Sequence, residues 1–333
     1  MRVNAISVAM LVGPVYLCAT NSGIRGMSVQ TMELDVTKEG VVGDGTPADT
    51  ARMQAVINAN IGATLLVRAG TALTFGPLKI PSLTHLRIDG TVRLANGSNY
   101  SLFELTGGEG VRLDGRGTLD GNRTGQRLIV GGPPPYSACI LAPGRLNPAA
   151  TPLRGLMVEG LTLANAFHWP LSLENVTGAR VRDVTALASG DSFQFTAGCD
   201  DCIADGVHID SIGDDGFAFY GGVTNSKLVN STVSRSVAGW VALNDSGSPR
   251  PCVAIVVANC IFASNQIGGA VQIGDGGVGM HEAVYSDGNM YYANPNGGLI
   301  WSSCALGQSN DHFGPGNTKG NCVVMPGQNV KVI

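Results

Sequence analysis

A short strand-like step recurs through the second half of the chain and constrains the fold more than any other feature. Each step has two apolar residues around one other residue, and the six steps begin at Leu171, Phe193, Phe217, Val241, Val271 and Leu299. Their starts are 22, 24, 24, 30 and 28 residues apart. Repeats of this length, built from short strands and Gly, Asn and Asp turns, are typical of a β-solenoid. A propeller is the main alternative, but its repeats are longer, at about 40 to 50 residues.

A second kind of string lies between these steps and alternates apolar with other residues. It occurs at residues 157–163, 180–185, 203–209 and 255–261, and similar strings at 86–92 and 111–119 extend the series upstream. Because alternation with a period of two buries one face, we expect each string to form one strand. The sequence therefore predicts an all-β solenoid whose coils stack along one axis.

Composition excludes several classes of protein. The chain has 333 residues, of which 44% are hydrophobic and 14% charged, and its net charge is −4. This balance argues against disorder, which needs low hydrophobicity and high charge. Without a basic run there is no electrostatic footprint for nucleic acid, so we expect no nucleic-acid partner. We expect residues 27–333 to form a single β-helix domain, since a chain of this length can bury a large core.

Residues 1–26 are a candidate signal peptide. One Arg precedes a short apolar run that is too short to span a membrane but suits a secretory segment. We therefore expect a secreted or extracellular protein. The alternatives are an N-terminal segment that packs on the body, or a start at Met27.

Eight cysteines bear on the compartment and on metal binding. Cys199 and Cys202 form a single CxxC without a second pair at zinc-ribbon spacing, so we expect no metal there and favour a turn disulfide or buried thiols. In an oxidising compartment, Cys304 and Cys322 are the favoured bridge.

Two segments are expected to sit at the borders of the solenoid. Asp49 and Thr50 precede an apolar pattern up to Ala59 that predicts an N-capped amphipathic helix, suited to cover the exposed edge of the first coil. Residues 131–152 are rich in proline and are expected to form a long loop that walls one side of a cleft.

Three carboxylates are expected to meet when the coils stack. Asp191 and Asp215 each stand two places before a step, so we expect them to be neighbours about 4.8 Å apart; Asp214 lies one residue earlier and points differently. Mutual repulsion should raise at least one pKa. One protonated and one ionised carboxyl group are what glycoside hydrolysis requires. The alternative is that each Asp only forms its turn.

Other side chains flank these carboxylates and are candidates for contacts with a sugar. Trp169 and Trp240 offer aromatic faces, and Gln194 is expected to project outward from its strand. His168 and Asp245 complete the predicted substrate-binding set. Each has an ordinary alternative: packing for a Trp, a surface or core position for His168, and a loop position for Asp245.

Several strings, in order, resemble the pectate lyase and polygalacturonase superfamily of right-handed single-stranded parallel β-helices. The opening string at residues 33–57 is the most specific, and similar strings follow at 115–122, 160–169, 190–191 and 213–215. Their order resembles glycoside hydrolase family 28 over residues 33–245. The resemblance implies that Asp214 is the general acid, that Asp191 and Asp215 activate the water of an inverting hydrolysis, and that no cofactor takes part.

The chain departs from that family where its basic residues would be. Ser189-Gly190-Asp191 keeps only the carboxylate of the family's Asn-Thr-Asp, and Ala238-Gly239-Trp240 has no histidine where the family has Gly-His-Gly. Residues 270–273 lack the family's cation. Because those basic groups hold galacturonate in the family, a neutral or differently charged glycan fits this chain better.

Two other functions remain open at this point. A polysaccharide lyase of the same fold would need an Arg or Lys base and usually calcium, and the column of carboxylates has no such base. A phage tail-spike or adhesin-type β-helix, a virion tail component, would bind glycan as a homotrimer. The expected partner in each case is a polysaccharide or oligosaccharide, and the hydrolase would be a monomer or a homotrimer.

Overall fold

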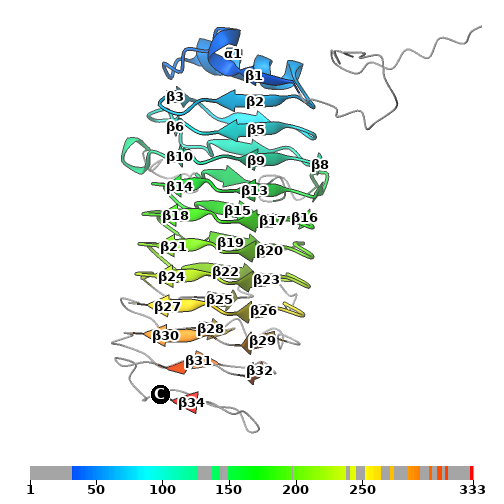
Figure 1. Ribbon diagram of the computed structural model, residues 1–333, viewed down its shortest axis with the longest axis vertical. Coiled ribbons are helices and arrows are strands. Elements are labelled where there is room, and N and C mark those ends of the chain that lie inside the picture. The colour runs from blue at the N-terminus through cyan, green and yellow to red at the C-terminus, as the bar shows by residue number, and fades with distance from the viewer. Residues whose placement is uncertain are drawn as a thin grey trace, which may run out of the picture.

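The protein is a tall stack of coils with a helix over its N-terminal end (Figure 1). The structure is a computed structural model. It describes residues 32–126, 137–142, 144, 149–191, 193–196, 198–237, 241–244, 252–263, 271–273, 284–287, 289–292, 300–301, 306–309, 312–313 and 331–332.

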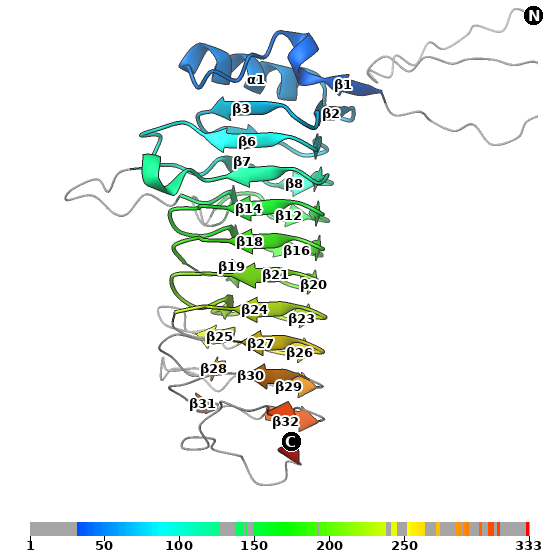
Figure 2. The ribbon, with the colours of Figure 1, turned by 60° about the vertical axis from the view of Figure 1, so that its left-hand side comes forward.

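Three long parallel sheets form the sides of the stack, and successive coils add one strand to each (Figure 2). Sheet A contains β1 (Glu33–Asp35), β2 (Thr64–Val67), β5 (His85–Ile88), β9 (Arg112–Asp114), β13 (Met157–Glu159), β17 (Arg180–Arg182), β20 (Ile203–Asp205), β23 (Lys227–Val229), β26 (Val256–Ala258), β29 (Val284–Asp287) and β32 (Leu306–Ser309). Sheet B contains β3 (Ala72–Phe75), β6 (Thr91–Leu94), β10 (Thr118–Asp120), β14 (Thr162–Ala164), β18 (Thr185–Leu187), β21 (His208–Asp210), β24 (Thr232–Ser234), β27 (Ile261–Ala263), β30 (Met290–Tyr292), β33 (His312–Phe313) and β34 (Lys331–Val332).

Sheet C is the third side, and a small sheet D lies between it and sheet A. Sheet C contains β4 (Leu78–Ile80), β7 (Phe103–Leu105), β11 (Ile140–Leu141), β15 (Leu171–Leu173), β19 (Phe193–Thr196), β22 (Phe217–Tyr220), β25 (Val241–Asn244), β28 (Val271–Ile273) and β31 (Ile300–Trp301). Sheet D contains β8 (Gly108–Glu109), β12 (Leu153–Arg154) and β16 (Val176–Thr177). The short 3-10 helices are η1 (Val36–Glu39) and η2 (Arg123–Gly125).

The predicted register of the coils is confirmed in sheet C. Phe193 pairs with Phe217, which pairs with Val241, and Val241 pairs with Val271. The rings of Phe193 and Phe217 are buried and stacked, with centroids 5.6 Å apart. Each fully buried ring stabilises the stack by about 1.5–3 kcal/mol, so these apolar columns hold the coils in register. The fold is a right-handed parallel β-helix.

The prediction of one strand for each longer string was wrong. Each string forms two strands, one in sheet A and the next in sheet B, and in four of the strings a residue in the left-handed conformation lies between them. These joints are Gly160 (φ +73°), Asp183 (+50°), Gly206 (+66°) and Asn259 (+54°). Gly, Asn and Asp adopt this conformation at the lowest energy, so a period-two pattern continues across a corner of the coil.

Helix α1 (Pro47–Ala59) covers the first coil as predicted, but it starts earlier than expected. Its N-cap is Thr46, whose hydroxyl accepts a hydrogen bond from the Asp49 N–H at 3.2 Å. The Asp49 carboxylate instead accepts hydrogen bonds from the N–H groups of Val42 (3.0 Å) and Gly43 (2.5 Å). These hydrogen bonds to Asp49 hold residues 42–43, which precede the helix, in place. Within the described residues, no helix has the length and hydropathy needed for a membrane span.

The proline-rich segment is not a loop throughout. It contains β11, whose Ile140 pairs with Phe103 on one side and Leu171 on the other. Both residues of β11 are buried. The short apolar run between the prolines therefore forms one strand of sheet C. Residues 131–136, 143 and 145–148 of this segment lie outside the described residues.

Five cysteines are described, and all are buried free thiols: Cys139, Cys199, Cys202, Cys252 and Cys260. Cys199 and Cys202 are therefore buried thiols in this structure, one of the two states expected for them. The favoured bridge between Cys304 and Cys322 lies outside the described residues, as does Cys18.

Candidate functional site

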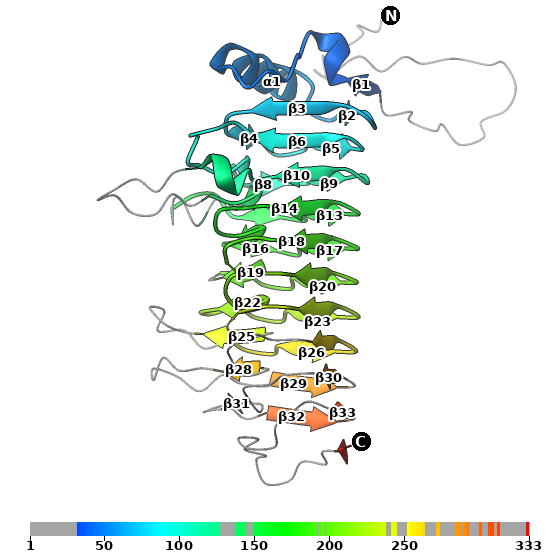
Figure 3. The same cartoon turned by 90° about the vertical axis from the view of Figure 1, so that its left-hand side faces the viewer.

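The predicted carboxylates lie on a row of stacked turns, which we call the turn row. It consists of the turns that lead from sheet B to sheet C after β14, β18 and β21 (Figure 3). Backbone hydrogen bonds join these turns: the Asp191 N–H donates to the His168 carbonyl at 2.9 Å, and the Gly213 N–H donates to the Ser189 carbonyl at 2.9 Å. The Val237 N–H, which follows β24, donates to the Asp214 carbonyl at 3.1 Å and so connects the row to the next coil. The row is thus a continuous edge of the stack.

The glycines immediately before Asp191 and Asp214 let the turns approach closely. A Cβ atom on Gly190 would lie 2.0 Å from the carbonyl oxygen of Phe167, and one on Gly213 would lie 2.5 Å from the carbonyl oxygen of Gly190. Both separations are far below van der Waals contact. The sequence pattern Gly-Asp therefore sets how near the carboxylates of successive coils come.

One extra residue in the last of these turns decides which carboxylates face each other. At the start of the turns, Leu187 pairs with Asp210, and counting forward aligns Asp191 with Asp214. At their ends, Phe193 pairs with Phe217, and counting backward aligns Asp191 with Asp215. The sequence prediction used only the second count.

The electrostatics couple Asp191 with Asp214. The pKa of the Asp214 carboxyl group is raised above its usual value. The main cause is partial desolvation of the carboxyl group by surrounding atoms, and the second is the negative charge of Asp191. The N–H of Asp215 partly opposes this rise. Asp214 is still an exposed residue, whereas Asp191 and Asp215 are partly buried. A carboxyl group whose pKa is raised and that remains accessible suits proton donation.

His168 and Trp169 lie in the preceding turn and have different surroundings. His168 is partly buried, and its ring centroid lies 5.2 Å from that of Trp169. Trp169 is only 5% exposed and packs with Ala138 and Leu141 in a small cluster outside the main core. In this structure Trp169 is a packing residue, and its face is not open to a sugar ring.

Gln194 lies on the outer face of sheet C, as predicted, but it is not exposed there. It is 4% exposed, and its side-chain Nε2 donates a hydrogen bond to the Ser172 hydroxyl at 2.9 Å. Its neighbours in register, Ser172 and Ala218, are also buried. This part of the outer face consists of small or mutually bonded side chains.

Trp240 and Asp245, the two other predicted contacts, lie outside the described residues. Among the residues that are described, no three His, Cys, Asp or Glu side chains come together in a way that could hold a metal ion.

Glu104 is a notable residue on the same sheet that the sequence analysis missed. It occupies the column of Ser172 and Gln194 through its pairing with Leu141. Burial raises the pKa of its carboxyl group, and Lys79 beside it partly opposes the rise. The signal was present, because Phe103-Glu104-Leu105 is another step of the recurring kind.

A polar pocket of about 600 Å³ lies further along the same edge of the stack, which we call the upper pocket. It is lined by Arg93, Asn96, Asn99, Asn122 and neighbouring residues of the turns after β6 and β10. Nε of Arg93 lies 3.7 Å from the Asp120 carboxylate, and the Arg93 side chain is 47% exposed. The upper pocket thus continues the turn row towards the N-terminal end with amide and guanidinium groups.

Comparisons with known proteins agree on the fold. No protein-family model matches the chain, and no curated protein sequence matches it. Among solved structures, the N-terminal fragment of bacteriophage Phi29 gene product 12 is similar, with a TM-score of 0.55 and 14% identity over 84% of this chain and 62% of that one.

Two further structures are similar over comparable lengths. The Dettilon tailspike protein (gp208) has a TM-score of 0.50 and 14% identity over 86% of this chain and 66% of that one. The exopolygalacturonase from Thermotoga maritima has a TM-score of 0.48 and 11% identity over 87% and 93%. This chain spans less than two thirds of the two phage proteins. The strand topology and the phage structures together identify the chain as a right-handed parallel β-helix.

Proposed function

We propose that this protein hydrolyses a polysaccharide with the carboxyl groups of the turn row, in the manner of glycoside hydrolase family 28. The observation that carries the proposal is the raised pKa of Asp214 next to the charge of Asp191. A carboxyl group with a raised pKa beside a second carboxyl group can supply the acid and the base that this reaction needs. The order of motifs in the sequence supports the same assignment.

The reaction follows the roles that the resemblance implies. Asp214 gives its proton to the glycosidic oxygen as the bond from that oxygen to the anomeric carbon breaks. Ionised Asp191, with Asp215, accepts a proton from a water molecule whose oxygen attacks the anomeric carbon from the opposite side. The product has inverted configuration, and proton exchange with solvent restores the starting state.

The turn row and the upper pocket suit a glycan that runs along the stack. Arg93, Asn96 and Asn99 would bind sugar units remote from the bond that is cleaved, and His168 would contact the unit near Asp191. A neutral or differently charged glycan fits this edge better than galacturonate, because the family's cations for galacturonate have no counterpart in the sequence. A secreted protein with residues 27–333 as its body remains part of the proposal.

Glycan binding without cleavage, by a tail-spike or adhesin-type β-helix, is the second candidate. It is favoured by the similarity to the Dettilon tailspike protein and by the burial of Trp169 and Gln194, which removes two of the expected sugar contacts. Under this candidate the Asp residues of the turn row would only stabilise their turns and would take no part in a reaction.

A panel of neutral and acidic polysaccharides separates the two candidates. We expect release of reducing ends from at least one polysaccharide, without the ultraviolet absorbance of unsaturated lyase products. The Asp214→Asn variant should lose this activity by about 10²–10⁴-fold, the usual contribution of a general acid, while it retains glycan binding. Asp201→Asn is the matched control. Asp201 is an exposed carboxylate outside the turn row, and it accepts a hydrogen bond from Arg180. Binding without hydrolysis of any polysaccharide would favour the second candidate.

The pH profile gives an independent check. Because Asp214 must be protonated, the rate should fall as the pH rises through its pKa, which lies above the usual value of 3.8. A rate governed by an ordinary Asp would instead fall at a lower pH.

A further inference from the structure

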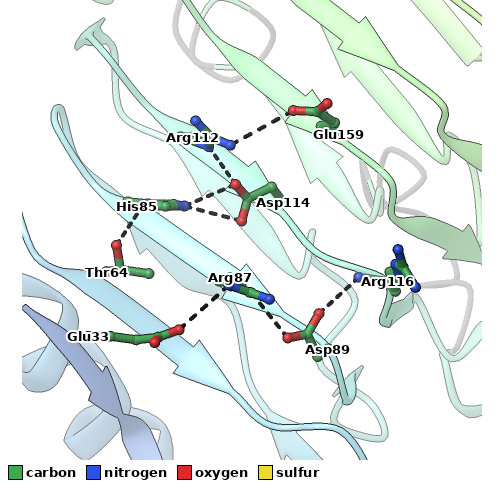
Figure 4. A network of polar contacts seen from close by, with 9 residues as sticks. All are labelled: Glu33, Thr64, His85, Arg87, Asp89, Arg112, Asp114, Arg116 and Glu159. Atoms are coloured by element: carbon green, nitrogen blue, oxygen red, sulfur yellow. Dashed lines mark hydrogen bonds and ion pairs between the residues drawn. The ribbon is translucent and has the colours of Figure 1, made fainter. Parts of the chain in front are cut away.

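A second concave polar surface lies on the outer face of sheet A, away from the turn row. We call it the sheet A trough (Figure 4). It has a volume of about 1120 Å³ and lies over β2, β5, β9 and β13 and over the turns that follow β5 and β9. Most of the residues that line it are polar or charged, so it offers many hydrogen-bonding groups to a ligand.

A hydrogen-bonded chain fixes the floor of the trough. The Thr64 hydroxyl lies 2.8 Å from Nδ1 of His85, and Nε2 of His85 lies 3.1 Å from both carboxylate oxygens of Asp114. Nε of Arg112 donates to the same carboxylate at 2.5 Å. Asp114 is only 9% exposed. These contacts hold the side chains in place, so a ligand would meet an already ordered surface.

A second group of side chains lies at the edge of the trough. Nε of Arg87 donates to the Asp89 carboxylate at 3.1 Å, and the backbone N–H of Arg116 donates to the other oxygen of Asp89 at 3.2 Å. The Arg87 side chain is 52% exposed. The guanidinium of Arg116, by contrast, makes no ion pair with any residue that the structure describes. Its hydrogen-bond donors are available to a ligand.

The charge pattern restricts the kind of ligand. Guanidinium groups alternate with carboxylates along the trough, as in Arg87 beside Asp89 and Arg112 beside Asp114. A ligand with net charge of either sign would meet groups of its own sign within the trough. A neutral ligand with many hydroxyl groups offers both donors and acceptors and pairs with both.

We propose that the sheet A trough binds a neutral oligosaccharide, at a site separate from the turn row. The trough extends over sheet A to the corner where sheet A turns into sheet B, whereas the turn row lies where sheet B turns into sheet C. The two sites therefore occupy different corners of the coil. The trough adds a place that holds glycan without cleaving it, so the inference goes beyond the proposed hydrolysis.

Calorimetric titration of the full chain tests this inference. The probes are neutral hexasaccharides of glucose, mannose and galactose, with hexagalacturonate as the acidic comparison. The titrated protein carries Asp214→Asn so that no probe is consumed. Arg116→Gln should weaken binding of a neutral probe about tenfold, the usual effect of losing a hydrogen bond from a charged group. Arg182→Gln is the matched control. Arg182 is exposed on β17 of the same sheet and lies outside the trough.

Hydrogen exchange locates the binding. We expect a neutral probe to protect residues 85–89 and 112–116 in the parent protein and to lose that protection in the Arg87→Gln, Arg116→Gln double variant. Thermal melting of each variant verifies that it is folded. Binding of none of the neutral probes, equal binding by the parent and the double variant, or protection confined to the turn row would overturn the inference. Hydrolysis by the wild-type chain is measured separately, so loss of either proposal leaves the other standing.

Discussion

Asp210 and Asp214 are only four residues apart, yet their surroundings shift their pKa values in opposite directions. Asp210 ends β21 and is buried; Arg235 and Ser234 of the next coil donate hydrogen bonds to its carboxylate. The hydrogen bond from Arg235 is the main cause that lowers the pKa of Asp210. Asp214 lies in the turn that follows, where partial desolvation and the negative charge of Asp191 raise its pKa.

The difference shows how the two parts of a coil use the same residue type. On the sheet, register places opposite charges on neighbouring coils, as Asp210 pairs with Ser234 and lies beside Arg235. In the turn row, register places like charges together because glycines bring the turns close. Carboxylates that pair with cations on the sheet therefore support the fold, and the crowded carboxylates of the turns are the ones that we propose for catalysis.

The largest expected effect is that of Asp191→Asn. It should reduce hydrolysis by about 10²–10⁴-fold because it removes the proposed base. It should also lower the pKa of Asp214, because one of the two causes of the rise is the charge of Asp191. NMR titration of the Asp214 carboxyl group measures this shift. An unchanged pKa would mean that the two turns do not act as a pair.

Gly213→Ala tests the close approach of the turns. A methyl group there would meet the carbonyl oxygen of Gly190 at 2.5 Å, so the coils must separate or the turn must distort. We expect a loss of about 1–3 kcal/mol in the free energy of unfolding, as for other overpacked sites. Gly76→Ala is the control, because its new methyl group would make only an ordinary contact of 3.4 Å with Thr50. Equal denaturant midpoints for the two variants would contradict this account.

Asp210→Asn tests the sheet side of the comparison. Because folding lowers the pKa of Asp210, its contribution to stability is complete above the usual value of 3.8 and is lost as the pH falls through the lowered value. We expect the variant to be less stable than wild type by about 1 kcal/mol at pH 7, since its partner Arg235 is exposed and water can replace the lost bond. The difference should shrink in acid; chemical unfolding at several pH values measures it.

Asp214→Asn should have the smallest effect on stability and the opposite sign. Folding raises the pKa of Asp214, so the protonated form favours the folded state and this advantage disappears as the pH rises through the raised value. Replacement by a neutral amide should therefore leave the protein as stable as wild type, or slightly more stable, at pH 7. A melting temperature below that of Asp210→Asn would show that the turn needs this carboxylate for its structure.

Much of the architecture could be predicted from the sequence because the apolar steps repeat. The strands that begin at Leu171, Phe193, Phe217, Val241 and Val271 stack in the predicted register, since burial of apolar residues in one column fixes it. The strings that cross a corner were misread, because alternation continues through a left-handed residue such as Gly160. The strand at Ile140 was missed because prolines surround it.

The residues of the candidate site were chosen from the sequence and remain a prediction, whereas their contacts could not be read from it. Asp191, Asp214 and Asp215 remain the proposed catalytic set, and counting back from the strands aligned Asp191 with Asp215. Burial of Trp169 by Ala138 and Leu141 depends on a segment some thirty residues away, which no local pattern reveals.

The sequence by itself determined that the chain winds into stacked coils and that acidic turns fall on one edge, because both follow from periodic spacing. Only the tertiary structure decided which of those acids face each other, which aromatic and amide groups are buried, and that a polar trough forms on sheet A. These outcomes depend on one extra residue in a turn and on packing between segments that are distant in the sequence. The spacing of the repeats alone reveals neither of these.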